Sequence, residues 1–268
     1  MQFSRSDMSR SLAKAVAACL AIACVALPGG CASSRAAPSA AGAATLTELG
    51  PATEATVRGQ DLRAALPGRT VFGVWDGRGD DRLVIERATS RTGEDAEYIQ
   101  RRFRVDSTGE TLDREQRLRV RQDGAVVLVE EVNHGEGVEV VFEPPLVVLP
   151  ARVEPGAMTN STGQMTVHPL GNRARVRAKG SVNERTTCLG AVRVVTPRGS
   201  FVAWKIQSTL DADLGASRVS NTTELWLVPE VGIIAERRRE KTTVLGLAIR
   251  NNTEAWVIVE PAPTSGPE

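Results

Sequence analysis

The chain has 268 residues, of which 41% are hydrophobic and 24% are charged, so it can bury the core of one large domain or two small ones. Its formal net charge is +1, and removing residues 1–30, which carry a net charge of +2, leaves about −1. This balance excludes a bulk electrostatic attraction to nucleic acid or to anionic lipid. Aromatic residues make up only 4%, so the core must consist mainly of Val, Leu, Ile and Ala.

The first thirty residues have the features of an export signal. Residues 1–14 are polar with a net positive charge, and residues 15–27 form an uncharged apolar run. That run is too short for a membrane-spanning helix, which needs about 20 residues. Small residues follow and end at Gly30, directly before Cys31. The pattern predicts a signal peptide over residues 1–30, cut between Gly30 and Cys31.

The sequence Leu27-Pro28-Gly29-Gly30-Cys31 resembles the lipobox of bacterial lipoproteins, with Pro28 in the usual aliphatic place. The resemblance implies that Cys31 receives diacylglycerol and that several acyl chains tether the protein to a membrane. Ala32, not Asp, follows the cysteine, which by the same resemblance favours the outer membrane, facing the periplasm. The alternatives are Cys19 or Cys24 as a rival lipidation site, plain secretion, and an uncleaved signal anchor.

The segment after Cys31 has the composition of a tether. Residues 32–45 are mostly Ala and Ser, with no hydrophobic period. We therefore expect four regions: a signal peptide at 1–30, the lipidated cysteine and tether at 31–45, a β-rich domain at 46–262 and a disordered tail at 263–268.

The folded region begins with one expected helix and continues with strands. Pro51–Leu66 is bounded by prolines and predicts a short helix. Beyond it the hydrophobic period becomes two, as in strands with one buried face. The runs that carry this period are Arg117–Arg121, Arg173–Lys179, Val202 with Trp204 and Ile206, and Thr243 with Leu245, Leu247 and Ile249.

Turn residues separate these runs at short intervals. Asp123-Gly124 and Pro197-Arg198-Gly199 predict tight reversals, and Asn251-Asn252 separates the last two runs. Twelve to fourteen strands are expected between Thr70 and Glu260. The predicted class is all-β, or β-rich α+β: a strongly curved antiparallel meander sheet or an open barrel with one short N-terminal helix. The alternative is two subdomains that divide near residues 144–155.

A second resemblance concerns the C-terminal third of the chain. Val194–Ile206 and Glu224–Ile234 are similar to a pattern in exported bacterial β-sheet domains of unknown function. Some of those domains resemble the lipoprotein carriers of the Lol pathway in shape. The resemblance implies a sheet architecture more than an activity.

No catalytic constellation emerges from the residue types. His134 and His168 lie near expected turns and are interpreted as loop residues. The acidic runs Asp76–Asp81 and Asp211–Asp213 are interpreted as turns, not as metal sites. Cys188 is interpreted as a small buried hydrophobe, with an exposed thiol as the alternative.

The hypothesis from sequence is therefore a membrane-anchored, non-enzymatic envelope lipoprotein without cofactor, metal or nucleic-acid partner. It would bind an apolar ligand, in a groove lined by Val, Leu, Ile and Trp, or another envelope component. One alternative is a structural or assembly lipoprotein that acts through protein contacts, and another is an unrecognised hydrolase. The ligand, the oligomeric state and the choice between inner and outer membrane stay open.

Overall fold

The computed structural model describes residues 44–260 apart from 54–55, 64–67, 76–80 and 92–95. It contains fifteen strands and one short helix, α2 (Gly59–Arg63), within these residues. The strands are β1 (Thr47–Pro51), β2 (Val57–Arg58), β3 (Gly68–Val74), β4 (Arg82–Arg91), β5 (Glu97–Asp106), β6 (Gly109–Val120), β7 (Val126–Asn133), β8 (Val138–Leu149), β9 (Arg152–Val153), β10 (Met158–Pro169), β11 (Ala178–Thr196), β12 (Gly199–Asp213), β13 (Ser217–Val228), β14 (Gly232–Val244) and β15 (Leu247–Glu260).

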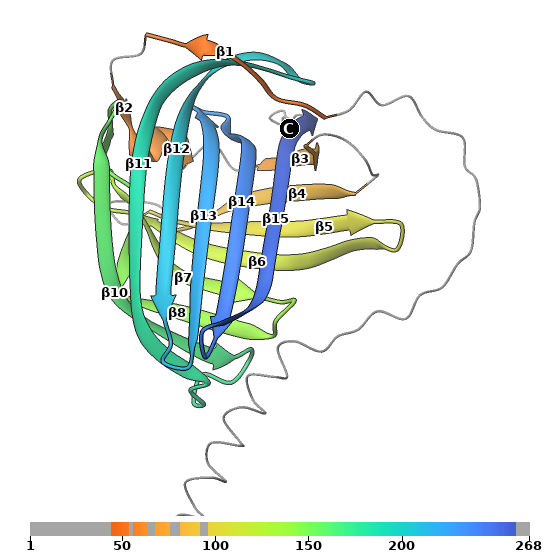
Figure 1. Cartoon of the computed structure of the whole chain (residues 1–268). Coiled ribbons are helices and arrows are strands. Elements are labelled where there is room, and N and C mark those ends of the chain that lie inside the picture. Colours follow the sequence, from red (N-terminus) through yellow and green to blue (C-terminus); the bar gives the residue numbers. More distant parts are fainter. Residues whose placement is uncertain (1–43, 54–55, 64–67, 76–80, 92–95, 261–268) are drawn as a thin grey trace, which may run out of the picture.

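Twelve of these strands close into an antiparallel barrel. The sheet runs from β3 through β8 and from β10 through β15, with β3 paired to β15, β8 to β10, and β11 to both β10 and β12. In Figure 1 the strands β3–β8 cross the strands β10–β15 at a steep angle. β1 extends the sheet by pairing with the far half of β11, from Thr47 opposite Val195 to Pro51 opposite Val192. The all-β, strongly curved sheet predicted from sequence is confirmed, and the barrel is closed.

Helix α2 packs against one end of the barrel interior. It contacts strands from both walls, namely β7, β8, β13 and β14. Its Leu62 is fully buried, which contributes about 2 kcal/mol of burial free energy. Gly59 is required where α2 begins, because a Cβ there would lie 2.1 Å from the carbonyl oxygen of Pro150. The other large side chains that are fully buried include Phe72, Ile85, Leu146, Leu149, Ile234 and Ile258.

The predicted helix over Pro51–Leu66 is only partly confirmed. The helix covers Gly59–Arg63, whereas Pro51 ends β1. The amide of Ala52 still donates to the carbonyl of Ala191 at 2.8 Å. Pairing with β11 therefore overrides the local pattern at the start of this stretch.

Two predicted reversals are confirmed. Asp123-Gly124 lies between β6 and β7, and Gly124 has φ +88°. Pro197 and Arg198 connect β11 to β12, and Gly199, with φ +135°, pairs with Thr196. Glycine is needed at both positions because other residues rarely adopt a positive φ.

Three other local predictions are wrong. Asn251 and Asn252 lie inside β15, and the turn is Leu245-Gly246, so the run from Thr243 to Ile249 is a hairpin and not one strand face. The alternating Arg173–Lys179 run is mostly a connection, with only its last two residues in β11. The two alternating runs have the period of a strand, but the strand pairing of the structure does not follow them.

The proline-rich stretch 144–155 does not interrupt the sheet. β8 continues through Pro144 and Pro145, and the strands on both sides of this stretch belong to the same barrel. In β12, Trp204 and Ile206 are buried as expected of one face, while Val202 is 37% exposed near the strand end.

Candidate functional site

The backbone ladder between β15 and β3 stops part-way along β15. β15 pairs with β3 only through Trp256–Glu260, and the amide of Trp75 donates to the carbonyl of Ala255 at 2.9 Å. Among the described residues, no strand pairs with this edge of β15 over Leu247–Glu254. The backbone groups of alternate residues point to the same side, so Asn251 and Thr253, in phase with Ala255, present theirs to the open edge. We call Leu247–Glu254 and the side chains that bridge it the seam.

Ion pairs connect the two groups of strands across the seam. Arg104 of β5 contacts Glu254 of β15 at 2.8 Å, and Arg250 of β15 contacts Glu136 of the β7–β8 turn at 2.6 Å. Arg104 also lies 3.3 Å from Asp113 of β6. Side-chain charges therefore hold the barrel wall together where backbone hydrogen bonds are missing.

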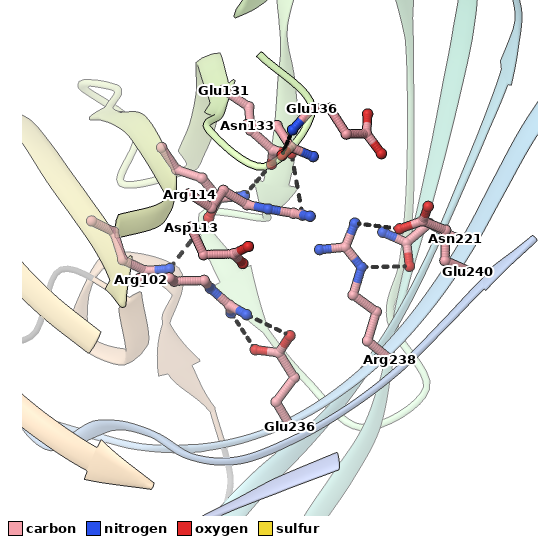
Figure 2. Close-up of polar contacts among 12 residues, drawn as sticks. Arg102, Asp113, Arg114, Glu131, Asn133, Glu136, Asn221, Glu236, Arg238 and Glu240 are labelled. Atoms are coloured by element: carbon pink, nitrogen blue, oxygen red, sulfur yellow. Dashed lines mark hydrogen bonds and ion pairs between the residues drawn. The ribbon is translucent and has the colours of Figure 1, made fainter. Parts of the chain in front are cut away.

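A deeper pair crosses the barrel interior. Nη1 of Arg102 on β5 donates to Oε1 of Glu236 on β14 at 2.9 Å, and its Nη2 contacts the other carboxylate oxygen (Figure 2). β5 and β14 are not neighbours in the sheet, so this contact runs through the lumen. A bidentate geometry of this kind fixes both the distance and the angle between the two walls.

Further polar groups continue this network along both walls (Figure 2). Arg114 lies 3.2 Å from Glu131, and Gln116 donates to the same carboxylate at 2.6 Å. On the opposite wall Arg238 donates to Asn221 at 3.2 Å and to Glu240 at 3.3 Å. Arginines and carboxylates thus alternate along this part of the lumen, and another buried arginine, Arg87, donates to the carbonyl of Val231 at 3.2 Å.

Exposure rises along this network toward the seam. The side chains of Glu236 and Arg102 are 4% and 11% exposed, while those of Arg250 and Arg104 are 44% and 46% exposed. The solvent exposure of these charged side chains is therefore greatest at the seam.

The pairing keeps these groups ionised. Burial alone would lower the pKa of Arg102, but the charge and hydrogen bonds of Glu236 outweigh it, so the pKa is raised. The pKa of Arg104 is raised in the same way, against burial, by Glu254. Burial would raise the pKa of Glu254, but Arg104 lowers it below its ordinary value of 4.5.

A groove of about 820 Å³ crosses β8 and β10–β14. The side chains of Val182 and Ala212 in this row are buried and face the interior, so their neighbours in the strands line the outer face. This is not the Val, Leu, Ile and Trp lining expected from sequence. The outer side chains include Thr162, Gln164, Ser181, Asn183, Asp211 and Lys241.

The residues singled out by sequence do not converge. His134 lies in the β7–β8 turn, as predicted. The loop prediction for His168 is wrong, because this residue lies in β10 opposite Glu139, with its Nδ1 3.0 Å from the carbonyl of Arg175. The turn predicted over Asp211–Asp213 is wrong, because these residues end β12 and pair with β11 and β13. Asp213 accepts the amide of Gly215 at 2.9 Å in the turn that follows. Cys188 is buried, as predicted for a small hydrophobe.

Other predicted positions lie outside the described residues. These are Gly30 and Cys31, and all of the acidic run Asp76–Asp81 except its last residue. Within the part of the chain that the structure describes, no three His, Cys, Asp or Glu side chains are grouped so that they could hold a metal ion. The described helices include none long and apolar enough to cross a membrane.

Sequence reasoning missed the charged lumen, although a signal for it exists. Strand β14 contains Arg237-Arg238-Arg239-Glu240, which puts charges on both faces of one strand. A strand with one buried face normally alternates polar and apolar residues. Charges at consecutive positions therefore indicate an interior that is itself polar.

Comparisons with known proteins give likenesses of shape only. The sequence matches no family model and no curated protein. One similar solved structure is a candidate exported protein of YmcC-like fold from Bacteroides fragilis, with 14% identity and a TM-score of 0.44 over 74% of this chain and 97% of that one. Another is a candidate lipoprotein from Parabacteroides distasonis, with 11% identity and a TM-score of 0.37 over 80% and 98% of the two chains. Likenesses at this level say nothing of function.

Proposed function

We propose that the protein is a lipid-anchored, non-enzymatic lipoprotein of the bacterial envelope that binds another envelope component at the seam. The signal sequence and Cys31 support export and anchoring, and Ala32 favours the outer membrane, facing the periplasm. The observation that carries the binding proposal is the open edge of β15, flanked by half-exposed charges.

An open strand edge is a ready place for an extended segment of another chain. The free backbone groups of Asn251 and Thr253 can pair with such a segment. Arg104 and Arg250, with their carboxylate partners, lie beside this edge and can select a polar partner. An acyl chain placed among these arginine–carboxylate pairs would have to desolvate them, which is costly. We therefore propose a polar partner and not an apolar ligand.

The electrostatics of the site favour binding over catalysis. A general acid or base works best with a pKa near neutrality. The pKa of Glu254 moves down and those of Arg102 and Arg104 move up, so each group is held in its charged form. These shifts suit fixed charges that orient a partner.

A proline scan of the open edge tests the binding proposal. Asn251→Pro removes an outward-facing amide, while Asn251→Ala keeps it and serves as the matched control. Membrane-extracted wild type, both variants and their bound molecules are compared by native mass spectrometry, with circular dichroism as the check on folding. We expect a component that accompanies the wild type and Asn251→Ala but not Asn251→Pro. An unchanged component on the proline variant, or none on the wild type, would contradict the proposal.

A further inference from the structure

Three chain connections lie at the same end of the sheet formed by β10–β15. The register places Val167 opposite Ala178, Asp213 opposite Arg218 and Val244 opposite Leu247. The connections that follow these pairs lie at the lower end of the barrel in Figure 1. We call them together the basal rim, which comprises residues 170–177, 214–216 and 244–249.

The basal rim concentrates exposed apolar side chains. It holds five of the ten large hydrophobic side chains that are exposed in the described part of the chain. Scattered exposed leucines are normal on a protein surface, but grouped ones indicate an interaction site. The five are Leu170 (43%), Val176 (55%), Leu245 (71%), Leu247 (73%) and Ile249 (43%).

One of these leucines occupies a strained backbone position. Leu245 has φ +50° and Gly246 has φ +84° in the two-residue turn between β14 and β15. Asn or Gly would occupy the first position with less strain. The amide of Leu245 donates to the carbonyl of Ala216 at 2.9 Å, which ties the turn to the neighbouring β12–β13 turn. A strained leucine presented to solvent on a fixed backbone indicates a role for its side chain.

Basic residues surround this apolar surface. Arg175 and Arg177 are exposed in the β10–β11 connection, and Lys179, Arg218 and Lys241 are exposed on the adjoining strands. Asp211 and Asp213 lie among them, and Asp213 pairs with Arg218 at 3.1 Å. The rim is locally basic although the whole chain is close to neutral. Apolar side chains ringed by Lys and Arg suit the interface of an anionic bilayer.

The tether is long enough for the rim to reach the membrane that would hold Cys31. Ala44 bridges to Trp75, which is hydrogen-bonded to Ala255 of β15. From Ala255 to Leu247 the strand extends roughly 26 Å, at about 3.3 Å per residue. The thirteen-residue step from Cys31 to Ala44 spans roughly 45 Å when extended.

We propose that the basal rim docks onto the surface of an anionic phospholipid bilayer, with Leu245 and Leu247 inserted among the lipid headgroups. That this is the bilayer that holds Cys31 rests on the anchoring proposed above. Docking would hold the open edge of β15 upright above the membrane, because that edge starts at Leu247.

Vesicle flotation of the unanchored chain tests the docking separately from the anchor. Residues 32–268 contain every described element of the barrel and lack Cys31. They are floated with vesicles of phosphatidylethanolamine and phosphatidylglycerol, and with neutral phosphatidylcholine vesicles for comparison. The variants are Leu245→Asn with Leu247→Ser, and Leu49→Asn, a matched control at a leucine that is 64% exposed on β1.

We expect the wild type and Leu49→Asn to float with the anionic vesicles and less well with the neutral ones. The double rim variant should partition roughly tenfold or more weakly. Flotation of the double variant at wild-type levels, or absence of the wild type from the anionic vesicles, would overturn the docking. Neither result depends on whether Cys31 carries lipid or whether the seam binds a partner.

Discussion

At the scale of single residues, the buried Arg102–Glu236 pair is the most demanding feature of the barrel. Both side chains are nearly enclosed, at 11% and 4% exposed. Each would be costly to bury alone, and only their mutual contact offsets the loss of hydration. The pair therefore stabilises this one arrangement of the two walls.

Glu236→Gln leaves Arg102 as a buried charge without its carboxylate. We expect a loss of about 3–5 kcal/mol in the free energy of unfolding, measured by urea titration. Asp213→Asn breaks the exposed pair with Arg218 and is the control, with an expected loss of about 1 kcal/mol or less. Equal losses from the two substitutions would mean that the lumen pair is as weak as the surface one.

Cys188 should be unreactive in the folded protein. It is 3% exposed, and burial raises the pKa of its thiol, which reduces the reactive thiolate. With dithionitrobenzoate we expect no labelling of residues 32–268 in buffer and one equivalent after unfolding in guanidinium. Fast labelling in buffer would place this thiol at the surface.

Glu254 gives the seam a defined pH dependence. Its pKa is lowered below 4.5 by Arg104, so its stabilising effect is complete above that value and is lost as the pH falls through the lowered pKa. The difference in urea midpoint between wild type and Glu254→Gln should be largest near about pH 7 and should vanish in acid. A difference in urea midpoint that grew in acid would contradict a lowered pKa of Glu254.

At the scale of single elements, we expect Leu245 of the β14–β15 turn to lower the stability of the fold while it strengthens the proposed membrane docking. Leu245→Asn relieves a left-handed leucine, so we expect a gain of about 1 kcal/mol in unfolding free energy. The same substitution should weaken flotation with anionic vesicles. A variant that is less stable than the wild type would show that Leu245 is held by packing and not by strain.

Several elements could be predicted from local sequence, and their failures have physical causes. Asp123-Gly124 and Pro197–Gly199 specify turns because glycine supplies the positive φ. Asn251-Asn252 has turn composition as well, yet these residues pair with β14 along the strand. There Asn252 donates to Glu254 at 3.0 Å. Pairing with β14 therefore keeps Asn251-Asn252 inside β15, and the turn forms at Leu245-Gly246 instead.

At the scale of the whole molecule, the barrel has α2 packed at one end and arginine–carboxylate pairs in its lumen and at the seam. The β content and the curvature could be predicted, because period-two runs and close turns are local features. The consecutive charges of β14 signal a polar interior, but the residues that line it could not be assigned, because bulges shift which residues face inward. One lies between Arg102 and Phe103 and another between Trp226 and Leu227, and their positions depend on the partner strand.

Lipid on Cys31 is the feature that would anchor the protein in the envelope, which is the central claim about its function. The most direct test is the intact mass of the protein extracted from membranes. We predict the mass of residues 31–268 plus a diacylglyceryl group and, in the fully processed form, one further acyl chain. A mass that includes residues 1–30, or that of a cleaved chain without fatty acid, would contradict the account.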